Sequence, residues 1–350
     1  MPVYLRSQLF DPTTVGAYHC YSRCVRRAFL CGEDGETERD YRYRLEWVRK
    51  RLEALAGIFA IDVLDHAVME NHVHTILRNR PDVAREWSGD ELLRRWSRLS
   101  RRQLELVPEA GEAEIREQLE DDAWVAEVRE RLSSLSWFML MLNEPLARKA
   151  NAEDKVSGHF WAERFGSVRL EDDESLLVCS LYVDLNPIRA GQCLTPEEAE
   201  YTGACDRWRD WQVELVVKGE LQASVLRRWF GTEAERAEFD FAPLLKRPRS
   251  GWLSPVRVEG DGYAGAGARR RASDKGYLPM TLAKYLEVLD ACGREEAQGK
   301  RGVIPSDLPP MLERLGLDRV RWLDAAWTAG KRFRWIAERC AEQTAERRRR

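Results

Sequence analysis

Two histidines lie two positions apart, at His72 and His74 in the sequence ENHVHTIL. The apolar and β-branched residues around them predict a strand, and residues i and i+2 of a strand point to the same face. Both imidazoles could then bind one metal ion, while Val73 faces the core. The alternative is two ordinary half-exposed histidines, because short motifs of this kind also occur by chance.

A tyrosine and an asparagine four positions apart form the second candidate site, at Tyr182 and Asn186 in YVDLNPIRAG. On a helix these residues share one face. A phenol beside a metal site can act as a nucleophile once it is deprotonated. The alternative is that Tyr182 packs in the core beside Leu181 and Leu185, and that Asn186 merely ends a helix before Pro187.

Arginines lie among aromatic residues in a third cluster, which comprises Phe160, Trp161, Arg164, Phe165 and Arg169. Such a mixture is suited to stacking on unpaired bases with phosphate contacts nearby. A buried aromatic strand with surface arginines explains the pattern equally well. The remaining histidines, at positions 19, 66 and 159, receive no role from the sequence.

Hydrophobic periodicity predicts the elements that must position these side chains. The order is strand, helix, strand, strand, with a further strand and helix later in the chain. The predicted strands cover residues 15–23, 60–69, 72–78 and 158–170, and the predicted helices cover residues 37–59 and about 172–186. The second helix is expected to end near Asn186 because a proline disfavours helical geometry in the residue before it.

The chain has 350 residues, which predicts more than one domain. Helical patterns with both signs of charge fill residues 79–135, and further helices are expected over 201–245. Residues 246–276 are rich in Gly, Arg, Ser and Pro, which predicts a flexible linker. Residues 277–350 are expected to form a small helical domain.

Composition narrows the class of protein. The 56 Lys and Arg residues nearly balance 59 Asp and Glu residues, so net charge alone does not indicate nucleic-acid binding. No run of apolar residues is long enough to span a membrane. The first residues carry no basic-then-apolar signal, and the eight cysteines form no CxxC pair, so we expect reduced thiols in a cytoplasmic protein.

Four motifs in this order, AYHCYSR, VMENHVHTIL, GHFWAERF and YVDLNPIRAG, resemble the single-tyrosine HUH transposases. The resemblance is closest to the branch that includes the REP-associated tyrosine transposases, and it covers about residues 15–195. It implies an α+β fold with a ferredoxin-like β-α-β-β-α-β-α catalytic domain over residues 1–200. A helical insertion at about 79–135 and a small α-helical C-terminal domain would be additions to that core.

The resemblance also implies the roles of the site residues. His72 and His74 would be two metal ligands, Asn186 the third, and Tyr182 the nucleophile. The family metal is Mg²⁺ or Mn²⁺, of which Mn²⁺ suits two imidazoles better. Attack by the tyrosine would leave a covalent 5′-phosphotyrosine and a free 3′-OH, so no nucleotide cofactor is needed. The chain departs from the family in having Glu70 where proline often precedes the histidine motif.

The implied substrate is single-stranded DNA, presented as hairpin or palindromic repeat ends, and the resemblance allows a homodimer. Four arginines are candidates for phosphate contacts, with ordinary surface charge as the alternative: Arg23, Arg164, Arg169 and Arg189. Two other classes of function remain open. One is a non-catalytic regulatory protein that binds structured single-stranded DNA, and the other is an RNA-binding ferredoxin-like domain that needs no metal and forms no covalent adduct.

Overall fold

A computed structural model describes residues 11–25, 31–34, 39–99, 119–232, 239–257 and 270–315. The chain divides into two compact units. The first comprises Met1–Glu171, Trp252–Pro255 and Glu259–Lys275, and the second comprises Asp172–Gly251, Val256–Val258 and Gly276–Arg350. This division follows contacts within the chain, so the assignment of residues 1–200 to one functional domain stays a prediction.

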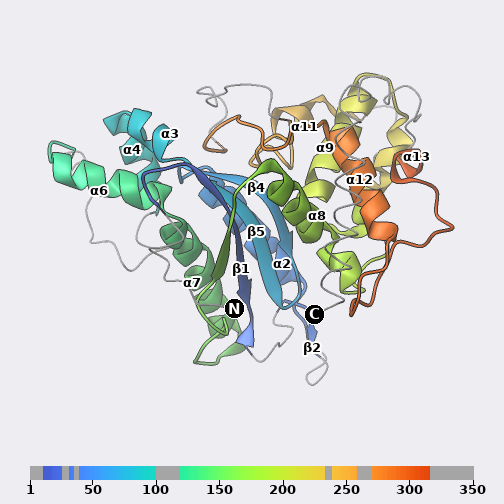
Figure 1. The fold of residues 1–350 in the computed structure, drawn as a ribbon, viewed down its shortest axis with the longest axis horizontal. Coiled ribbons are helices and arrows are strands. Elements are labelled where there is room, and N and C mark those ends of the chain that lie inside the picture. Colours follow the sequence, from blue (N-terminus) through green and yellow to red (C-terminus); the bar gives the residue numbers. More distant parts are fainter. Residues whose placement is uncertain are drawn as a thin grey trace. The chain divides into compact units, whose positions relative to one another are not determined.

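The first unit is built on a four-stranded antiparallel sheet (Figure 1). Its strands are β1 (Gly16–Arg23), β4 (Ile61–Val68), β5 (His72–Asn79) and β6 (Gly166–Leu170), in the spatial order β4-β5-β1-β6. All three pairs of neighbours are antiparallel. With the helices described next, this confirms the predicted α+β class. Two short strands, β2 (Glu33–Asp34) and β3 (Arg39–Asp40), pair separately.

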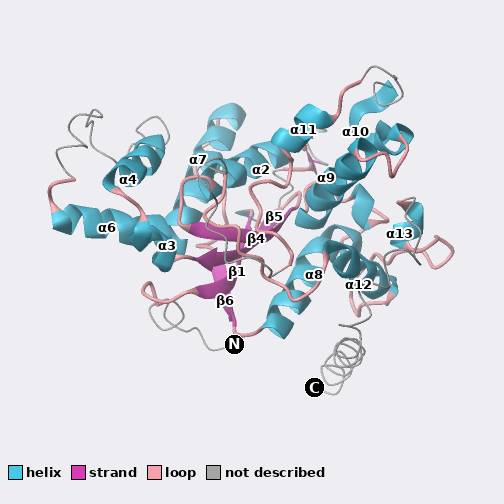
Figure 2. Ribbon diagram, turned by 90° about the horizontal axis from the view of Figure 1, so that it is seen from above, coloured by secondary structure: helices cyan, strands magenta, loops and turns pink. Residues whose placement is uncertain are grey.

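Two helices, α2 (Tyr43–Ala56) and α7 (Leu135–Asp154), lie side by side against the sheet (Figure 2). Helix α2 buries the apolar row predicted from its spacing, which includes Leu45, Val48, Leu52 and Leu55. Polar contacts fix α7, because Asn143 Nδ2 donates to Ser22 Oγ of β1 at 2.8 Å. Both helices therefore leave the opposite face of the sheet to other groups.

The predicted helical insertion over residues 79–135 is helical where the structure describes it. It contains α3 (Pro81–Glu86), α4 (Gly89–Trp96), the 3₁₀ turn η2 (Ser97–Leu99) and α6 (Asp122–Ser133), and residues 100–118 lie outside the described part. Ser88 caps α4 by accepting a hydrogen bond from the Glu91 amide, and Asp121 caps α6. These helices form a group beyond one end of the sheet (Figure 1).

The fourth predicted strand is shorter than expected. It was predicted over residues 158–170, but β6 begins at Gly166. The preceding segment pairs only locally with the end of β1 and the residues after it, where Ala162 N donates to Arg23 O at 2.8 Å and Val25 N donates to Phe160 O at 3.0 Å. The aromatic residues gave this segment the composition of a strand without a continuous partner.

The second unit is helical. Its elements are α8 (Asp173–Arg189), η3 (Pro196–Glu198), α9 (Gly203–Val217), η4 (Ala223–Leu226), α10 (Arg227–Phe230), α11 (Ala242–Lys246), α12 (Leu282–Arg294) and α13 (Met311–Arg314). A buried hydrogen bond joins α12 to α8, in which Tyr285 Oη donates to Asp184 at 2.5 Å. Of the predicted C-terminal helical domain, residues 316–350 lie outside the described part.

Residues 246–276 differ from the flexible linker that their composition predicts. The side chain of Trp252 is 0% exposed, and Leu253 forms a parallel bridge with Val63 of β4. The Ser254 amide donates to Val63 O at 2.9 Å. Ser273 Oγ, also fully buried, donates to Asp62 at 2.8 Å. Both described parts of this segment are therefore anchored by buried contacts.

The seven cysteines in the described part of the chain are free thiols. Within that part, no helix combines the length and apolar character that a membrane-spanning segment requires.

Candidate functional site

The two candidate metal ligands lie at the start of β5, on one face of the sheet. Strand pairing places Tyr21 directly opposite His74, and His19 opposite Ile76. Residues directly opposite one another, and residues two apart on a strand, share a face. His19 and Tyr21 of β1 therefore share the face of His72 and His74, as the sequence predicted for the histidine pair itself.

The structure brings three imidazoles together on this face. The ring centroids of His72 and His74 are 4.8 Å apart with an interplanar angle of 88°, and those of His19 and His74 are 5.0 Å apart. His19 Nε2 and His74 Nδ1 are hydrogen-bonded at 2.9 Å. His74 is 6% exposed, and His72 and His19 are partly buried.

Each histidine of the predicted pair is held through its Nδ1 atom. His72 Nδ1 lies 2.6 Å from Asn71 Oδ1, and His74 Nδ1 bonds to His19. Since the amide oxygen only accepts, His72 donates from Nδ1, and its neutral form then carries the lone pair on Nε2. Metal-binding histidines commonly have the other ring nitrogen fixed by such a partner. The two imidazoles therefore fit the role of metal ligands chemically.

His19 was not assigned a role from the sequence. Burial lowers its pKa to about 4, so the imidazole is neutral at pH 7. A neutral imidazole carries one donor and one acceptor nitrogen, as a bond with another imidazole requires. The alternation within β1 would have shown that His19 and Tyr21 share a face, but only the pairing of β1 with β5 shows which face that is.

The other two histidines lie elsewhere. His66 of β4 pairs with Thr75, which points to the face opposite that of His74. Its ring packs against Trp252, with centroids 4.9 Å apart. His159 is exposed and lies outside the described strands.

Tyr21 closes the β6 side of the imidazole cluster. Gly166 is its direct partner on β6, and the Tyr21 ring covers the position that a Cβ atom at Gly166 would occupy. The tyrosine ring centroid is 6.1 Å from that of His74. Glycine at position 166 therefore lets the ring lie across the edge strand beside the histidines.

The candidate nucleophile belongs to α8 of the second unit. Asp172 caps this helix in a capping box with Ser175. The side chain of Tyr182 is 45% exposed, which excludes the alternative of a buried core tyrosine. Neighbouring residues Leu181 and Leu185 are buried and supply the apolar row.

Asn186 is 5% exposed, and its Nδ2 atom has no hydrogen-bond partner among the described residues. The helix was predicted to end near Asn186, but α8 continues through Pro187 to Arg189. Pro187 lies in the last turn of α8, where the loss of one intrahelical hydrogen bond affects little of the helix, so the helix tolerates it here. Tyr182 and Asn186 lie in the second unit, and the three histidines lie in the first.

Within the described residues, no group of three or more His, Cys, Asp or Glu side chains could hold a metal ion. Two imidazoles and an amide oxygen would form a different set of ligands. Asn186 is the residue to which the sequence motif assigns the third position, and an amide would bind an ion through Oδ1 and not through the unpaired Nδ2.

The four arginines proposed for phosphate contacts differ in their environments. Arg23 and Arg164 are exposed, and Arg169 forms an ion pair of 3.4 Å with Glu171. These three stay candidates.

Arg189 has a structural role. Its guanidinium donates to the backbone carbonyls of Cys292 at 2.8 Å, Glu295 at 2.6 Å and Gly302 at 3.3 Å. Burial lowers its pKa. Both terminal nitrogens of Arg189 donate to backbone carbonyls at the end of α12 and after it. A phosphate contact for Arg189 is therefore not supported.

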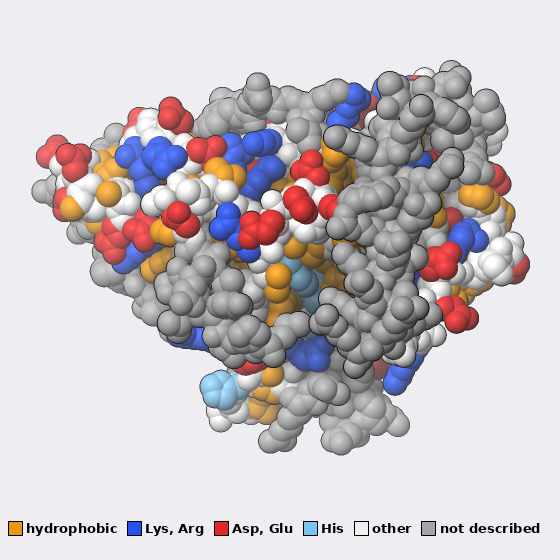
Figure 3. Space-filling view, in the orientation of Figure 1, with side chains coloured by type: hydrophobic (Ala, Val, Ile, Leu, Met, Phe, Trp, Pro, Cys, Tyr) orange, Lys and Arg blue, Asp and Glu red, His pale blue; other side chains and the backbone are white. Residues whose placement is uncertain are grey.

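The aromatic residues of the GHFWAERF motif also serve packing. Phe160 is 5% exposed and lies edge-on to Trp161, with ring centroids 4.9 Å apart. Trp161 Nε1 donates to Asn143 O of α7 at 2.9 Å. These contacts favour the interpretation of the cluster as buried aromatic residues with surface arginines. Lys and Arg side chains are interspersed with Asp and Glu over the face drawn in Figure 3, which agrees with the balanced net charge.

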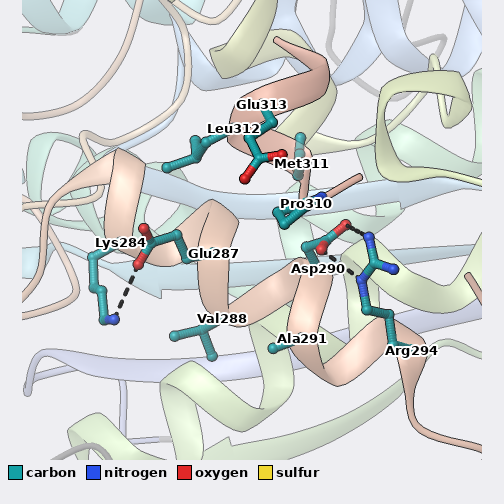
Figure 4. Close-up of a pocket in the computed structure, with 10 residues that line it drawn as sticks. All are labelled: Lys284, Glu287, Val288, Asp290, Ala291, Arg294, Pro310, Met311, Leu312 and Glu313. Carbon is teal, nitrogen blue, oxygen red and sulfur yellow. Dashed lines mark hydrogen bonds and ion pairs between the residues drawn. The ribbon is translucent and has the colours of Figure 1, made fainter. Parts of the chain in front are cut away.

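A pocket of about 310 Å³ lies between α12 and α13 in the second unit (Figure 4). Two ion pairs lie among its lining residues, Lys284 with Glu287 and Asp290 with Arg294. None of its lining residues belongs to the predicted site.

Comparisons of the chain with protein-family models, curated proteins and solved structures found no match. The likeness to single-tyrosine HUH transposases therefore rests on the four motifs and on the geometry of their residues.

Proposed function

We propose that this protein is a metal-dependent single-stranded DNA transposase of the single-tyrosine HUH type. It would cleave and rejoin DNA through a covalent 5′-phosphotyrosine on Tyr182. Its proposed substrates are hairpin or palindromic repeat ends, and we propose that it acts in the cytoplasm, with a homodimer as one form.

The pair of imidazoles on β5 carries this proposal. His72 and His74 share one face, their rings are 4.8 Å apart, and a neighbouring side chain holds Nδ1 of each. Two ordinary surface histidines would not need such fixed orientations. A divalent ion bound by their Nε2 atoms and by Asn186 Oδ1 would polarise the scissile phosphodiester.

The topology supports a ferredoxin-like catalytic core. Numbered along the chain, the four strands are β1, β4, β5 and β6, and the first strand lies between the third and the fourth. Helix α2 lies between the first two of these strands in the chain, and α7 precedes β6. Helix α8, which bears the tyrosine, follows the last strand directly. This sequence of elements agrees with the β-α-β-β-α-β-α core that the motifs imply, with α3, α4 and α6 as additions to it.

Tyr182 would perform the transfer itself. Its oxygen attacks phosphorus, the new bond joins tyrosine Oη to phosphorus, and the bond from phosphorus to the 3′ oxygen breaks. The phenolic proton is released to solvent and the departing 3′ oxygen takes one up. Attack by a second 3′-OH reverses the step. The phenol of Tyr182 is exposed, which agrees with a role as nucleophile.

A second candidate is the non-catalytic regulatory protein that binds structured single-stranded DNA. It requires no metal site, and it keeps the exposed Arg23 and Arg164 as candidates for phosphate contacts. It predicts tight binding of the DNA without cleavage and without dependence on Tyr182.

A strand-cleavage assay tests the proposal. Purified full-length protein is incubated with labelled single-stranded DNA from the flanks of its own gene, with Mn²⁺ or with a chelator. We expect metal-dependent cleavage that Tyr182→Phe and His74→Ala abolish. Tyr43→Phe is the matched control, because Tyr43 is 44% exposed compared with 45% for Tyr182. Equal cleavage by wild type and Tyr182→Phe would exclude the mechanism.

A further inference from the structure

The bond between His19 and His74 joins two strands that are far apart in the sequence. The residues are 55 positions apart, yet His19 Nε2 and His74 Nδ1 lie 2.9 Å from each other. His19 is on β1, which pairs with β5 on one side and β6 on the other, opposite Ile76 and Val168 respectively. A central strand with partners on both sides restricts the position of its side chains, so His19 is well placed to orient a neighbour.

We propose that His19 is a positioning residue that holds His74 in the tautomer protonated on Nδ1. This inference rests on the proposed function. It gives His19 the task of presenting the Nε2 lone pair of His74 to the metal ion, although His19 itself binds no ion. The motif that contains His19, AYHCYSR, would thus contribute directly to the orientation of the ligand.

The direction of the hydrogen bond decides the tautomer. A neutral imidazole has one N–H and one lone pair, so in this bond one ring donates and the other accepts. If His74 donates from Nδ1, its Nε2 carries the lone pair. If His19 donates instead, the proton of His74 lies on Nε2 and blocks ligation through that atom.

The first direction gives His74 the same tautomer as the neighbouring His72. His72 donates from Nδ1 to Asn71 Oδ1 at 2.6 Å, so its lone pair is on Nε2. The His72 and His74 rings are almost perpendicular, at 88°. With His19 as the acceptor, the two histidines have the same tautomer and each offers Nε2. Partners of this kind fix both the tautomer and the ring orientation of metal-binding histidines.

Two substitutions separate this role from simple packing. His19→Leu removes the acceptor, whereas His19→Gln keeps an amide oxygen at a reach close to that of Nε2. The imidazole signals of the full-length, metal-free protein are recorded by long-range ¹H–¹⁵N NMR. We expect His74 protonated on Nδ1 in the wild type and in His19→Gln, and loss of this preference in His19→Leu. His159→Gln, at an exposed position, is the control.

Titration with Mn²⁺ provides the second measurement. We expect His19→Leu to weaken Mn²⁺ binding by about 10- to 100-fold, and His19→Gln to restore most of it. Wild-type His74 protonated on Nε2 would overturn the inference, even if His19→Leu failed to fold. Unchanged Mn²⁺ affinity in a folded His19→Leu protein would also overturn it. A wild-type protein that binds Mn²⁺ with the expected tautomer but cleaves no DNA would refute the proposed function and leave the role of His19 intact.

Discussion

Trp252 offers a direct test of whether residues 246–276 are a linker or part of the packed fold. Its side chain is fully buried. The centroid of its ring lies 4.9 Å from the centroid of the His66 ring and 5.9 Å from the guanidinium carbon of Arg49. Burial of a tryptophan removes about 200 Å² from water, which at about 25 cal/mol per Å² stabilises the fold by about 5 kcal/mol.

One polar group reduces that gain. The indole Nε1 is buried and has no hydrogen-bond partner among the described residues. Leaving such a donor unsatisfied costs about 2 kcal/mol. We therefore expect Trp252→Ala to lower the free energy of unfolding by about 3 kcal/mol. Trp252→Phe retains most of the ring and removes the unsatisfied N–H, so it should cost about 1 kcal/mol or less.

Urea unfolding of the full-length variants measures these differences, and hydrogen exchange at the Ser254 amide reports locally on the segment. This amide bonds to Val63 O at 2.9 Å and should be protected in the wild type and exposed to exchange in Trp252→Ala. Leu194→Ala, at a side chain that is 59% exposed, is the control and should change stability by less than about 0.5 kcal/mol. A Trp252→Ala protein as stable as this control, with fast exchange at Ser254 in the wild type, would refute the packing argument.

Two further predictions concern buried polar groups. Tyr285→Phe removes the 2.5 Å hydrogen bond to the fully buried Asp184 and should destabilise the protein by about 2 kcal/mol in urea unfolding, whereas no change would show that the bond does not contribute. His19 has its pKa lowered from 6.5 to about 4 by burial, so below pH 6.5 the unfolded chain takes up a proton that the folded chain does not. Through this group, the free energy of unfolding should therefore fall by about 3 kcal/mol as the pH falls from about 6.5 to 4. His19→Gln should remove that part of the pH dependence. The same pH dependence in His19→Gln and the wild type would contradict this prediction.

The elements near the histidine pair were predictable from local patterns. The apolar and β-branched residues around His72 and His74 identified β5, and the short turn before it separated β5 from β4. Hydrophobic periodicity identified α8. In each case the signal is carried by neighbouring residues, whose spacing matches the period of the element.

The features that were missed depend on contacts between distant residues. His19 acquires its partner only through the register of β1 against β5, which its own strand does not specify. The glycine- and arginine-rich composition around Trp252 indicated flexibility, although one buried ring and one backbone bond to Val63 anchor this part of the chain. The helix was expected to end near Asn186 because a proline disfavours helical geometry in the residue before it. That expectation takes no account of the buried contacts that the last turn of α8 makes in the folded protein.

Covalent capture on Tyr182 tests the central proposal most directly. Full-length protein is incubated with labelled single-stranded DNA from its own genomic flanks and Mn²⁺, denatured, digested and mapped by mass spectrometry. The account predicts a DNA adduct on the peptide that contains Tyr182, formed only with metal and absent with duplex DNA. Tight binding of the same strand without any adduct would contradict the account and support the non-catalytic DNA-binding protein instead.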